Sequence, residues 1–593
     1  MPTLQRVQRE DPVLDKAVLN GDGVPENAPM ETVHCDAADA AAAPGSIGPL
    51  PVSRRSTLRA IAVGGALAAA PVVLGAQTAE AAAAPSATAS GSGSSAAAST
   101  TPSSAATPLL WRQPEKLGAP PVDGLHLTFG ADPTRQMTVS WSTVVPVSRP
   151  QVRFGTADGG FGSEVTATTR TYIDAASGNE VYVNHAALSG LRPDTTHIYA
   201  ALADGVLPDA GTFRTAPTGR VPFTFTSFGD QSVPTAAWVP GTGSAAGTYS
   251  AGIAGIPSPA AADIVHGIEL IQPLFHLLNG DLCYANLTPD RVRTWNSFFA
   301  NNTRSARYRP WMPAAGNHEN ELGNGPIGYQ SFLTRFALPS NGSADWDGLW
   351  YTFQVGGVRV IVLQNDDVAL QDAGDSYVNG YSGGAQKAWL EQQLKAARSS
   401  KSVDWIVVCM HQVIISSSNA NGADLGIRQN WGPLFDQYGV DLVLCGHEHD
   451  YERSFAVRGT VSGSATLTPN PVSSATDVID TSKGTVHMVL GGGGTSAPSN
   501  GEFFTDGTGK VITAVGPVGS SGKRPPVYVS EQAVWSAVRD LTHPYGFASF
   551  DVDPGTRPGG QTSIRVTYYN VAVPGGAVTP LESFVLTRSR SDG

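Results

Sequence analysis

Five short polar blocks, each placed at the end of a run of apolar residues, constrain the fold of this chain most. The runs are short and unbroken, which is typical of strands in a sheet that is covered on both faces. Helical segments lie between some of them, notably residues 384–397, so strand and helix alternate. The runs cover residues 223–228, 274–278, 312–315, 405–410 and 440–444, with a further run at 358–363. The pattern predicts a layered α/β domain over residues 220–590.

The polar blocks carry side chains that can bind cations. Ligands of layered α/β folds bind at the carboxyl ends of the strands, so we expect all five blocks to meet at one edge of the sheet. Glycines within the blocks let the backbone turn sharply and bring side chains close together. The blocks are Gly229-Asp230, Gly280-Asp281-Leu282-Cys283-Tyr284, Gly316-Asn317-His318-Glu319, Val408-Cys409-Met410-His411 and Gly446-His447-Glu448-His449.

Two carboxylates, one amide, three histidines and a phenol are suitable ligands for Fe, Mn or Zn. Singly, an aspartate after glycine is typical of a turn, and a lone histidine at a strand end is typical of a packed core; the ordered set favours a site. One cation rarely needs seven such ligands, whereas two cations that share Asp281 would use them all. The predicted ligands are Asp230, Asp281, Tyr284, Asn317, His411, His447 and His449.

The N-terminal segment has the order of an export signal. Residues 53–59 are basic, residues 60–76 are apolar and rich in alanine, and Ala79-Glu80-Ala81 fits a cleavage site. The pair Arg54-Arg55 makes the segment resemble a bacterial twin-arginine signal. An uncleaved anchor is disfavoured, because glycine and proline break a run already short for about 30 Å of hydrocarbon. We predict a leader over residues 1–81 and a secreted or cell-envelope protein without a stable membrane anchor.

Two segments separate the leader from the main domain. Residues 82–114 begin with a stretch of Ala, Ser, Thr, Gly and Pro that cannot form a core, which predicts a flexible linker. Residues 115–217 alternate in polarity, as in Met137–Trp141, and predict a small all-β sandwich with Trp141 in its core. The turn at Leu191-Arg192-Pro193, followed by a strand with Tyr199, resembles a fibronectin type III module. We expect this module to have a packing or positioning role.

Charge and cysteine content exclude some classes. The formal net charge of −12 disfavours binding to nucleic acid through a basic face. Of four cysteines, Cys35 lies in the leader, and the remaining three are an odd number that cannot form a complete disulfide framework. We expect Cys283, Cys409 and Cys445 to be small buried packing residues.

The ordered set of blocks resembles the purple acid phosphatases, within the calcineurin-like metallophosphoesterases. Gly-Asn-His-Glu and Gly-His-x-His mark the superfamily, and Tyr284 in Gly-Asp-x-x-Tyr narrows the match. The resemblance covers residues 115–590. It implies a metallophosphoesterase fold, which is a layered β-sandwich flanked by helices, preceded by the fibronectin III-like domain.

The resemblance also implies a role for each residue. Fe(III) would be held by Asp230, Tyr284 and His449, and a divalent Zn, Mn or Fe ion by Asn317, His411 and His447. Asp281 would bridge the two ions. His318 would act as the catalytic acid near the leaving group, and Glu319 would orient its neighbours.

The implied activity is hydrolysis of small phosphate monoesters by metal-held hydroxide, in an exported acid phosphatase-like enzyme of open oligomeric state. The alternative is a phosphodiesterase or nucleotidase on the same site. A non-catalytic binding protein is disfavoured because no ligand is missing. The chain departs from many plant members, which carry a further histidine after the Val-x-x-His block, since residues 412–430 contain none. Arg428 in this loop could face a phosphate, although a structural or solvated role is favoured.

Overall fold

The computed structural model describes residues 121–593, except 235–237, 240–247, 250–255, 372, 373, 375 and 521. The predicted leader and linker, with Arg54-Arg55 and Cys35, lie outside the described residues. Within the described ranges, no helix has the length and apolar character needed to cross a membrane.

The first described domain is an all-β sandwich, as predicted. Its two four-stranded sheets have the orders β1-β2-β6-β5 and β4-β3-β7-β8. Trp141 on β2 is fully buried between them, as expected. The strands are β1 (Asp123–Phe129), β2 (Met137–Thr143), β3 (Gln151–Thr156), β4 (Gly160–Thr166), β5 (Thr168–Ile173), β6 (Glu180–Leu188), β7 (Thr196–Leu202) and β8 (Asp209–Arg214).

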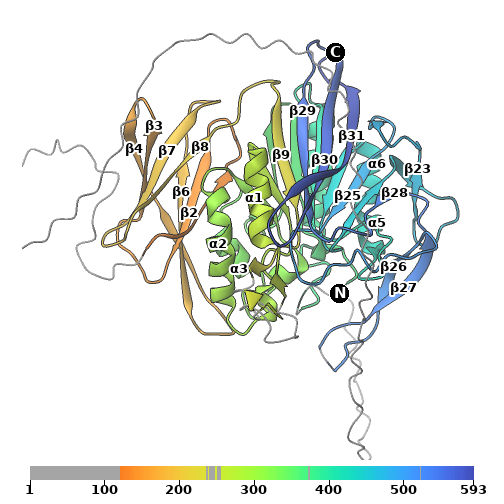
Figure 1. Ribbon diagram of the computed structural model, residues 1–593, viewed down its shortest axis with the longest axis horizontal. Coiled ribbons are helices and arrows are strands. Elements are labelled where there is room, and N and C mark those ends of the chain that lie inside the picture. The colour runs from red at the N-terminus through yellow and green to blue at the C-terminus, as the bar shows by residue number, and fades with distance from the viewer. Residues whose placement is uncertain are drawn as a thin grey trace, which may run out of the picture. The chain divides into compact units, whose positions relative to one another are not determined.

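The main domain contains two seven-stranded mixed sheets (Figure 1). The first has the order β15-β14-β9-β29-β30-β31-β24, from β9 (Phe223–Phe228), β14 (Phe275–Asn279), β15 (Trp311–Ala314), β24 (Val478–Asp480), β29 (Gly546–Asp553), β30 (Gln561–Val571) and β31 (Val578–Ser589). The second has the order β16-β17-β18-β20-β25-β21-β28, from β16 (Tyr351–Val355), β17 (Val358–Val362), β18 (Trp405–Cys409), β20 (Leu442–Cys445), β21 (Tyr451–Ser454), β25 (Val486–Leu490) and β28 (Ser536–Arg539).

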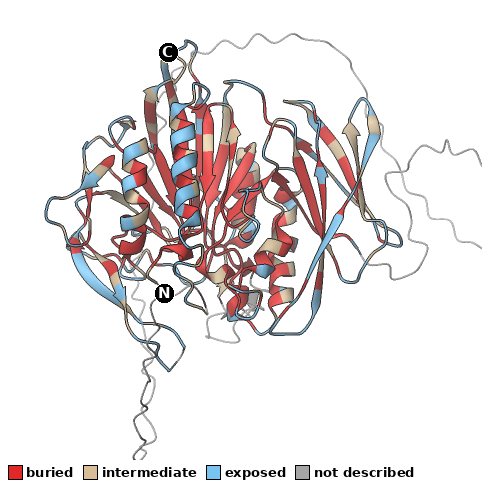
Figure 2. Ribbon diagram, turned by 180° about the vertical axis from the view of Figure 1, so that it is seen from behind, coloured by how far each residue is buried: buried red, intermediate tan, exposed pale blue. Residues whose placement is uncertain are grey.

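The two sheets share one core and carry helices on their outer faces. Successive side chains of a strand point to opposite faces, and β18 shows this clearly. Trp405 and Val407 pack in the core shared with the first sheet, whereas Ile406 and Val408 pack in a separate core with the helices. Figure 2 shows the strands largely buried beneath helices that expose one face. The predicted layered β-sandwich flanked by helices is therefore confirmed.

The helices and the remaining strands connect these sheets. The helices are α1 (Ala261–Ile271), α2 (Arg291–Ala306), α3 (Gln330–Arg335), α4 (Ala385–Ser399), α5 (Leu425–Asn430) and α6 (Gly432–Tyr438), with 3₁₀ turns η1 (Ala285–Leu287), η2 (Asn317–Glu319) and η3 (Asn365–Asp367). A three-stranded sheet contains β19 (Ala423–Asp424), β26 (Thr508–Val515) and β27 (Pro526–Gln532). Short pairs are formed by β10 (Val233–Pro234) with β13 (Pro257–Ser258), β11 (Trp238–Val239) with β12 (Thr248–Tyr249), and β22 (Val457–Thr460) with β23 (Pro469–Pro471).

The expectation that all five blocks meet at one edge of a single sheet was wrong. Three blocks follow β9, β14 and β15 of the first sheet, and two follow β18 and β20 of the second. Within each sheet these strands run parallel, so their carboxyl ends lie at the same end. A strand buried on both faces has the same apolar sequence whether a helix or a second sheet covers it, so the runs did not reveal the second sheet.

The N-terminal sandwich is attached to the main domain through the region of α3. The Thr128 hydroxyl donates to the Ala337 carbonyl at 2.6 Å. His185 lies with Nε2 at 2.9 Å from the Thr334 carbonyl, and the Arg335 guanidinium donates to the Tyr172 hydroxyl at 2.7 Å. These contacts fix the sandwich against the layer of helices that covers the first sheet.

Candidate metal centre

The first group of predicted ligands gathers residues from both sheets. The Tyr284 hydroxyl lies 3.0 Å from His449 Nε2 and 3.2 Å from Asp230 Oδ1. His449 Nε2 is itself 3.4 Å from Asp230 Oδ1. One phenol, one imidazole and one carboxylate thus direct their donor atoms toward the same point.

The second group lies beside Asp281. His411 Nε2 is 3.0 Å from Asn317 Oδ1, 3.2 Å from His447 Nδ1 and 3.1 Å from Asp281 Oδ2. Asp281, His411 and His447 alone place one ligand atom each within 4.8 Å of one another. The structure therefore brings the seven predicted side chains together as two groups of three, with Asp281 against the second.

Backbone carbonyls set the protonation of two of the histidines. His411 Nδ1 lies 2.7 Å from the Asn279 carbonyl, and His449 Nδ1 lies 2.5 Å from the Ala497 carbonyl. A carbonyl can only accept, so each Nδ1 carries the hydrogen and donates it. Each Nε2 then faces its group of ligands, which is the arrangement that metal-binding histidines use.

Unusual backbone conformations aim the ligands. Asp230, Asp281, Tyr284 and His447 have positive φ angles of 62°, 51°, 54° and 73°. Each such residue costs on the order of 1–3 kcal/mol, and residues of this kind concentrate at functional sites. Gly280 also has positive φ, and a Cβ there would lie 2.6 Å from His411 Nδ1.

Electrostatics couples the buried ligands. Burial opposes ionisation of both His411 and Asp281, but their mutual attraction is stronger. It raises the pKa of His411 to about 10 and lowers the pKa of Asp281 well below its usual range. Burial, with the charges of Asp230 and Asp281, raises the pKa of Tyr284 well above 10, so a strong cation is needed to ionise this phenol.

Glu319 orients the loops instead of facing the ligands, as expected. Its carboxylate accepts hydrogen bonds from the backbone N–H groups of Gly316, Asp281 and Leu282 at 2.7, 2.9 and 2.8 Å. Burial, followed by the Asp281 charge, raises the pKa of Glu319 to about 8. The carboxylate ties together the two loops that carry Asp281 and Asn317.

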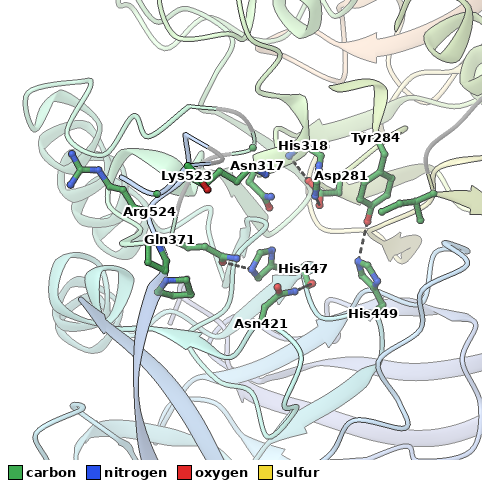
Figure 3. A pocket seen from close by; sticks show the side chains of 16 residues that line it. Asp281, Tyr284, Asn317, His318, Gln371, Asn421, His447, His449, Lys523 and Arg524 are labelled. Carbon is green, nitrogen blue, oxygen red and sulfur yellow. Dashed lines mark hydrogen bonds and ion pairs between the residues drawn. The ribbon is translucent and has the colours of Figure 1, made fainter. Parts of the chain in front are cut away.

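His318 lies outside the groups of ligands and lines the pocket above them (Figure 3). Its backbone N–H donates to Asp281 Oδ1 at 2.9 Å, and its Nδ1 lies 3.0 Å from Asn286 Oδ1. Its Nε2 is 4.0 Å from Asp281 Oδ2. The imidazole is therefore held next to the ligands with one nitrogen engaged by Asn286.

The pocket has a volume of about 490 Å³ and contains residues that the sequence did not single out. The Gln371 amide oxygen lies 2.7 Å from His447 Nε2, and the Asn421 amide donates to the His447 carbonyl at 2.9 Å. Lys523 and Arg524 also line the pocket. These residues lie in loops without periodicity or a motif, so the sequence carried no signal for them.

Two expectations about other residues are confirmed. Cys283, Cys409 and Cys445 are buried free thiols. Arg428 is buried and structural, because its guanidinium donates two hydrogen bonds of 2.7 Å to the Glu531 carboxylate.

The donor set fits a pair of cations. His411 Nε2 and His447 Nδ1 face each other, and oxygen atoms of Asn317 and Asp281 meet at the same point, so a cation there would engage all four. The phenol, carboxylate and imidazole of the first group offer a second position. Two facing sheets that carry such a set at their strand ends define a dimetal phosphoesterase.

Comparison with known proteins identifies the group more closely. Residues 122–215 match the purple acid phosphatase N-terminal domain, and residues 258–451 match the calcineurin-like phosphoesterases. The chain belongs to the purple acid phosphatase family. The resemblance found in the motifs is thus confirmed.

Similar proteins come from bacteria and plants. The chain is 56% identical over 486 residues to the uncharacterized protein Rv2577 of Mycobacterium tuberculosis, which covers 82% of this chain and 90% of that protein. It is 26% identical over 387 residues to Fe(3+)-Zn(2+) purple acid phosphatase 12 of Arabidopsis thaliana, covering 63% and 72%. The structure of purple acid phosphatase PPD1 from yellow lupin shares the fold, with a TM-score of 0.57 at 20% identity over 79% of this chain and 75% of that one.

Proposed function

We propose that the chain is an exported, acid phosphatase-like enzyme that hydrolyses small phosphate monoesters. The observation that carries the proposal is the convergence of Asp281, His411 and His447 beside Asp230, Tyr284 and His449. Export is supported by the basic, apolar and small-residue order of residues 53–81.

The residue assignments follow the two groups. Asp230, Tyr284 and His449 would hold Fe(III), because a buried phenol is ionised best by a strongly charged cation. Asn317, His411 and His447 would hold a divalent Zn, Mn or Fe ion, and Asp281 would serve both positions. The two cations would offset the negative charge of the phosphoryl oxygens and acidify the attacking water.

The protein residues then orient and protonate. His318 faces the pocket at the edge of the ligand groups, where it can give a proton to the departing alkoxide. General acids of this kind accelerate reactions by roughly 10²–10⁴-fold. Asn286 and the Asp281 carboxylate hold the His318 ring and backbone in place.

Substrate class is tested with two esters that share one leaving group. We expect the purified, metal-loaded chain to hydrolyse p-nitrophenyl phosphate with a kcat/KM at least about tenfold above that for bis(p-nitrophenyl) phosphate. The second ester adds a bulky group and removes one negative charge from the phosphate, and so weakens its attraction to two cations. A faster rate on the diester would contradict the monoesterase and favour the phosphodiesterase.

The role of Tyr284 as an iron ligand is tested by visible absorption spectroscopy. We expect the metal-loaded chain to absorb visible light through phenolate-to-Fe(III) charge transfer, and Tyr284→Phe to lose that band. The matched control is Tyr182→Phe, because Tyr182 lies in the N-terminal sandwich, where its hydroxyl donates a hydrogen bond to the Glu180 carboxylate. An unchanged absorption spectrum of Tyr284→Phe at equal iron content would exclude Tyr284 as the iron ligand.

A further inference from the structure

Two positively charged side chains line the pocket of this acidic protein. Lys523 and Arg524 come from the loop that joins β26 to β27, and both are among the residues that line the pocket of His318 and Asp281 (Figure 3). Among the described residues that line this pocket, Asp281 has the one carboxylate, and it lies at the base with the predicted metal ligands. The formal net charge of the chain is −12, so the two neighbouring basic residues at this pocket contrast with the overall balance. Such a pocket attracts anions.

The loop that carries the cations is held by its own backbone. The Gly516 N–H donates to the Pro525 carbonyl, and the Gly519 N–H donates to the Lys523 carbonyl, each at 2.8 Å. The Arg524 guanidinium lies over the Tyr377 ring, 4.8 Å from its centroid. Cations presented on a constrained loop lose less conformational entropy when they bind a ligand.

Lys523 lines the same pocket as His318, the residue proposed to protonate the leaving group (Figure 3). His318 faces the leaving group in the proposed function. A group attached to the leaving group would therefore extend toward Lys523 and Arg524.

The pocket is larger than one phosphate group requires. Its 490 Å³ lies within the range of roughly 300–1,000 Å³ that holds whole small molecules. We propose that Lys523 and Arg524 form a subsite for a second anionic group, a phosphate or a carboxylate, on the leaving-group side of the substrate. The proposal rests on the proposed function and deepens it: the preferred monoesters carry a second negative group.

Three matched esters test the subsite on the full, metal-loaded chain. Phenyl phosphate has no second anion, 4-carboxyphenyl phosphate has a carboxylate, and 1,4-phenylene bisphosphate has a second phosphate. We expect the double variant Lys523→Ala, Arg524→Ala to lower kcat/KM for the charged esters about 10- to 100-fold, mainly through KM. Its kcat/KM for phenyl phosphate should stay within about twofold of the parent value.

Two control variants separate charge from folding. Lys395→Ala removes an exposed cation on α4, away from the residues that line the pocket, and should leave all three esters unaffected. The exchange Lys523→Arg, Arg524→Lys keeps both charges and should retain most of the preference for charged esters. A loss on one charged ester alone supports the subsite and identifies its anion as carboxylate or phosphate.

Several results would overturn the inference. An equal loss of kcat/KM on all three esters would mean that Lys523 and Arg524 contact the scissile phosphate or stabilise the fold. An unchanged kcat/KM on both charged esters would exclude the subsite. Failure of the unaltered chain to hydrolyse phenyl phosphate would instead contradict the proposed function itself, so the two failures are distinguishable.

Discussion

Replacing Asp281 with asparagine is expected to lower phosphate ester hydrolysis by about a thousandfold or more and to deplete bound metal. Asp281 is the one predicted ligand shared by both cation positions, and its two carboxylate oxygens contact different residues. Oδ1 accepts the His318 N–H at 2.9 Å, while Oδ2 faces His411 Nε2 at 3.1 Å. Loss of one preorganised charge-stabilising group costs about 10²–10³-fold in other enzymes, and loss of a shared ligand should cost more. The measurement is kcat/KM on p-nitrophenyl phosphate with metal analysis of the same preparation.

The matched control for this variant is Asp551→Asn. Asp551 is exposed on β29, a strand of the same sheet as β14, and accepts a hydrogen bond from Thr224. This control should keep its full metal content and activity. If Asp281→Asn also retained both, Asp281 could not be a shared metal ligand, and the arrangement of two groups around it would need another explanation.

The strands and the ligand set could be predicted because the same short stretches specify both. The run Phe223–Phe228 forms β9 with the predicted bounds, and Asp230 follows it at the sheet end. A buried strand must be apolar, so a polar block at its end has few roles other than a turn or a site. The order of five such blocks carried the ligand prediction, and the structure brings those side chains within hydrogen-bonding distance of one another.

The second sheet could be predicted only through the family resemblance and not from the apolar runs, and the wall of the pocket could not be predicted. Val407 and Val408 on β18 pack in different cores, yet both are valines, so the sequence does not record which layer each one meets. Gln371, Lys523 and Arg524 reach the pocket through loops whose course depends on long-range packing. Polar residues in loops are common, and nothing local distinguishes these from solvated ones.

The blocks also contain glycines whose role appears only in three dimensions. Gly316 has φ −88° and ψ −176°, an extended conformation that any residue can adopt. What excludes a side chain is proximity: an added Cβ would overlap Asp281 Oδ1 and lie 2.5 Å from the Asp281 nitrogen. Glu319 also fixes the Gly316 N–H at 2.7 Å, so the loop cannot withdraw without losing this hydrogen bond.

The Gly316→Ala variant should therefore damage the site more than the fold. We expect it to lower the free energy of unfolding by about 1–3 kcal/mol, the usual cost of overpacking. A displacement of Asp281 by about 1 Å should lower kcat/KM about a hundredfold. The readouts are urea unfolding, metal content and kinetics on p-nitrophenyl phosphate.

Gly432→Ala is the control variant. It separates the effect of steric overlap with Asp281 from the general effect of replacing a glycine with alanine. Gly432 begins α6, and an added Cβ would meet nothing within 4 Å. Alanine favours the helix by up to about 1 kcal/mol over glycine, so this variant should be equally or more stable and fully active. Normal activity and metal content in Gly316→Ala would mean that the Asp281 carboxylate can move without consequence, which contradicts a fixed site between two cations. A loss of activity and metal content in Gly316→Ala but not in Gly432→Ala would show that position 316 must lack a side chain for the Asp281 carboxylate to hold its place.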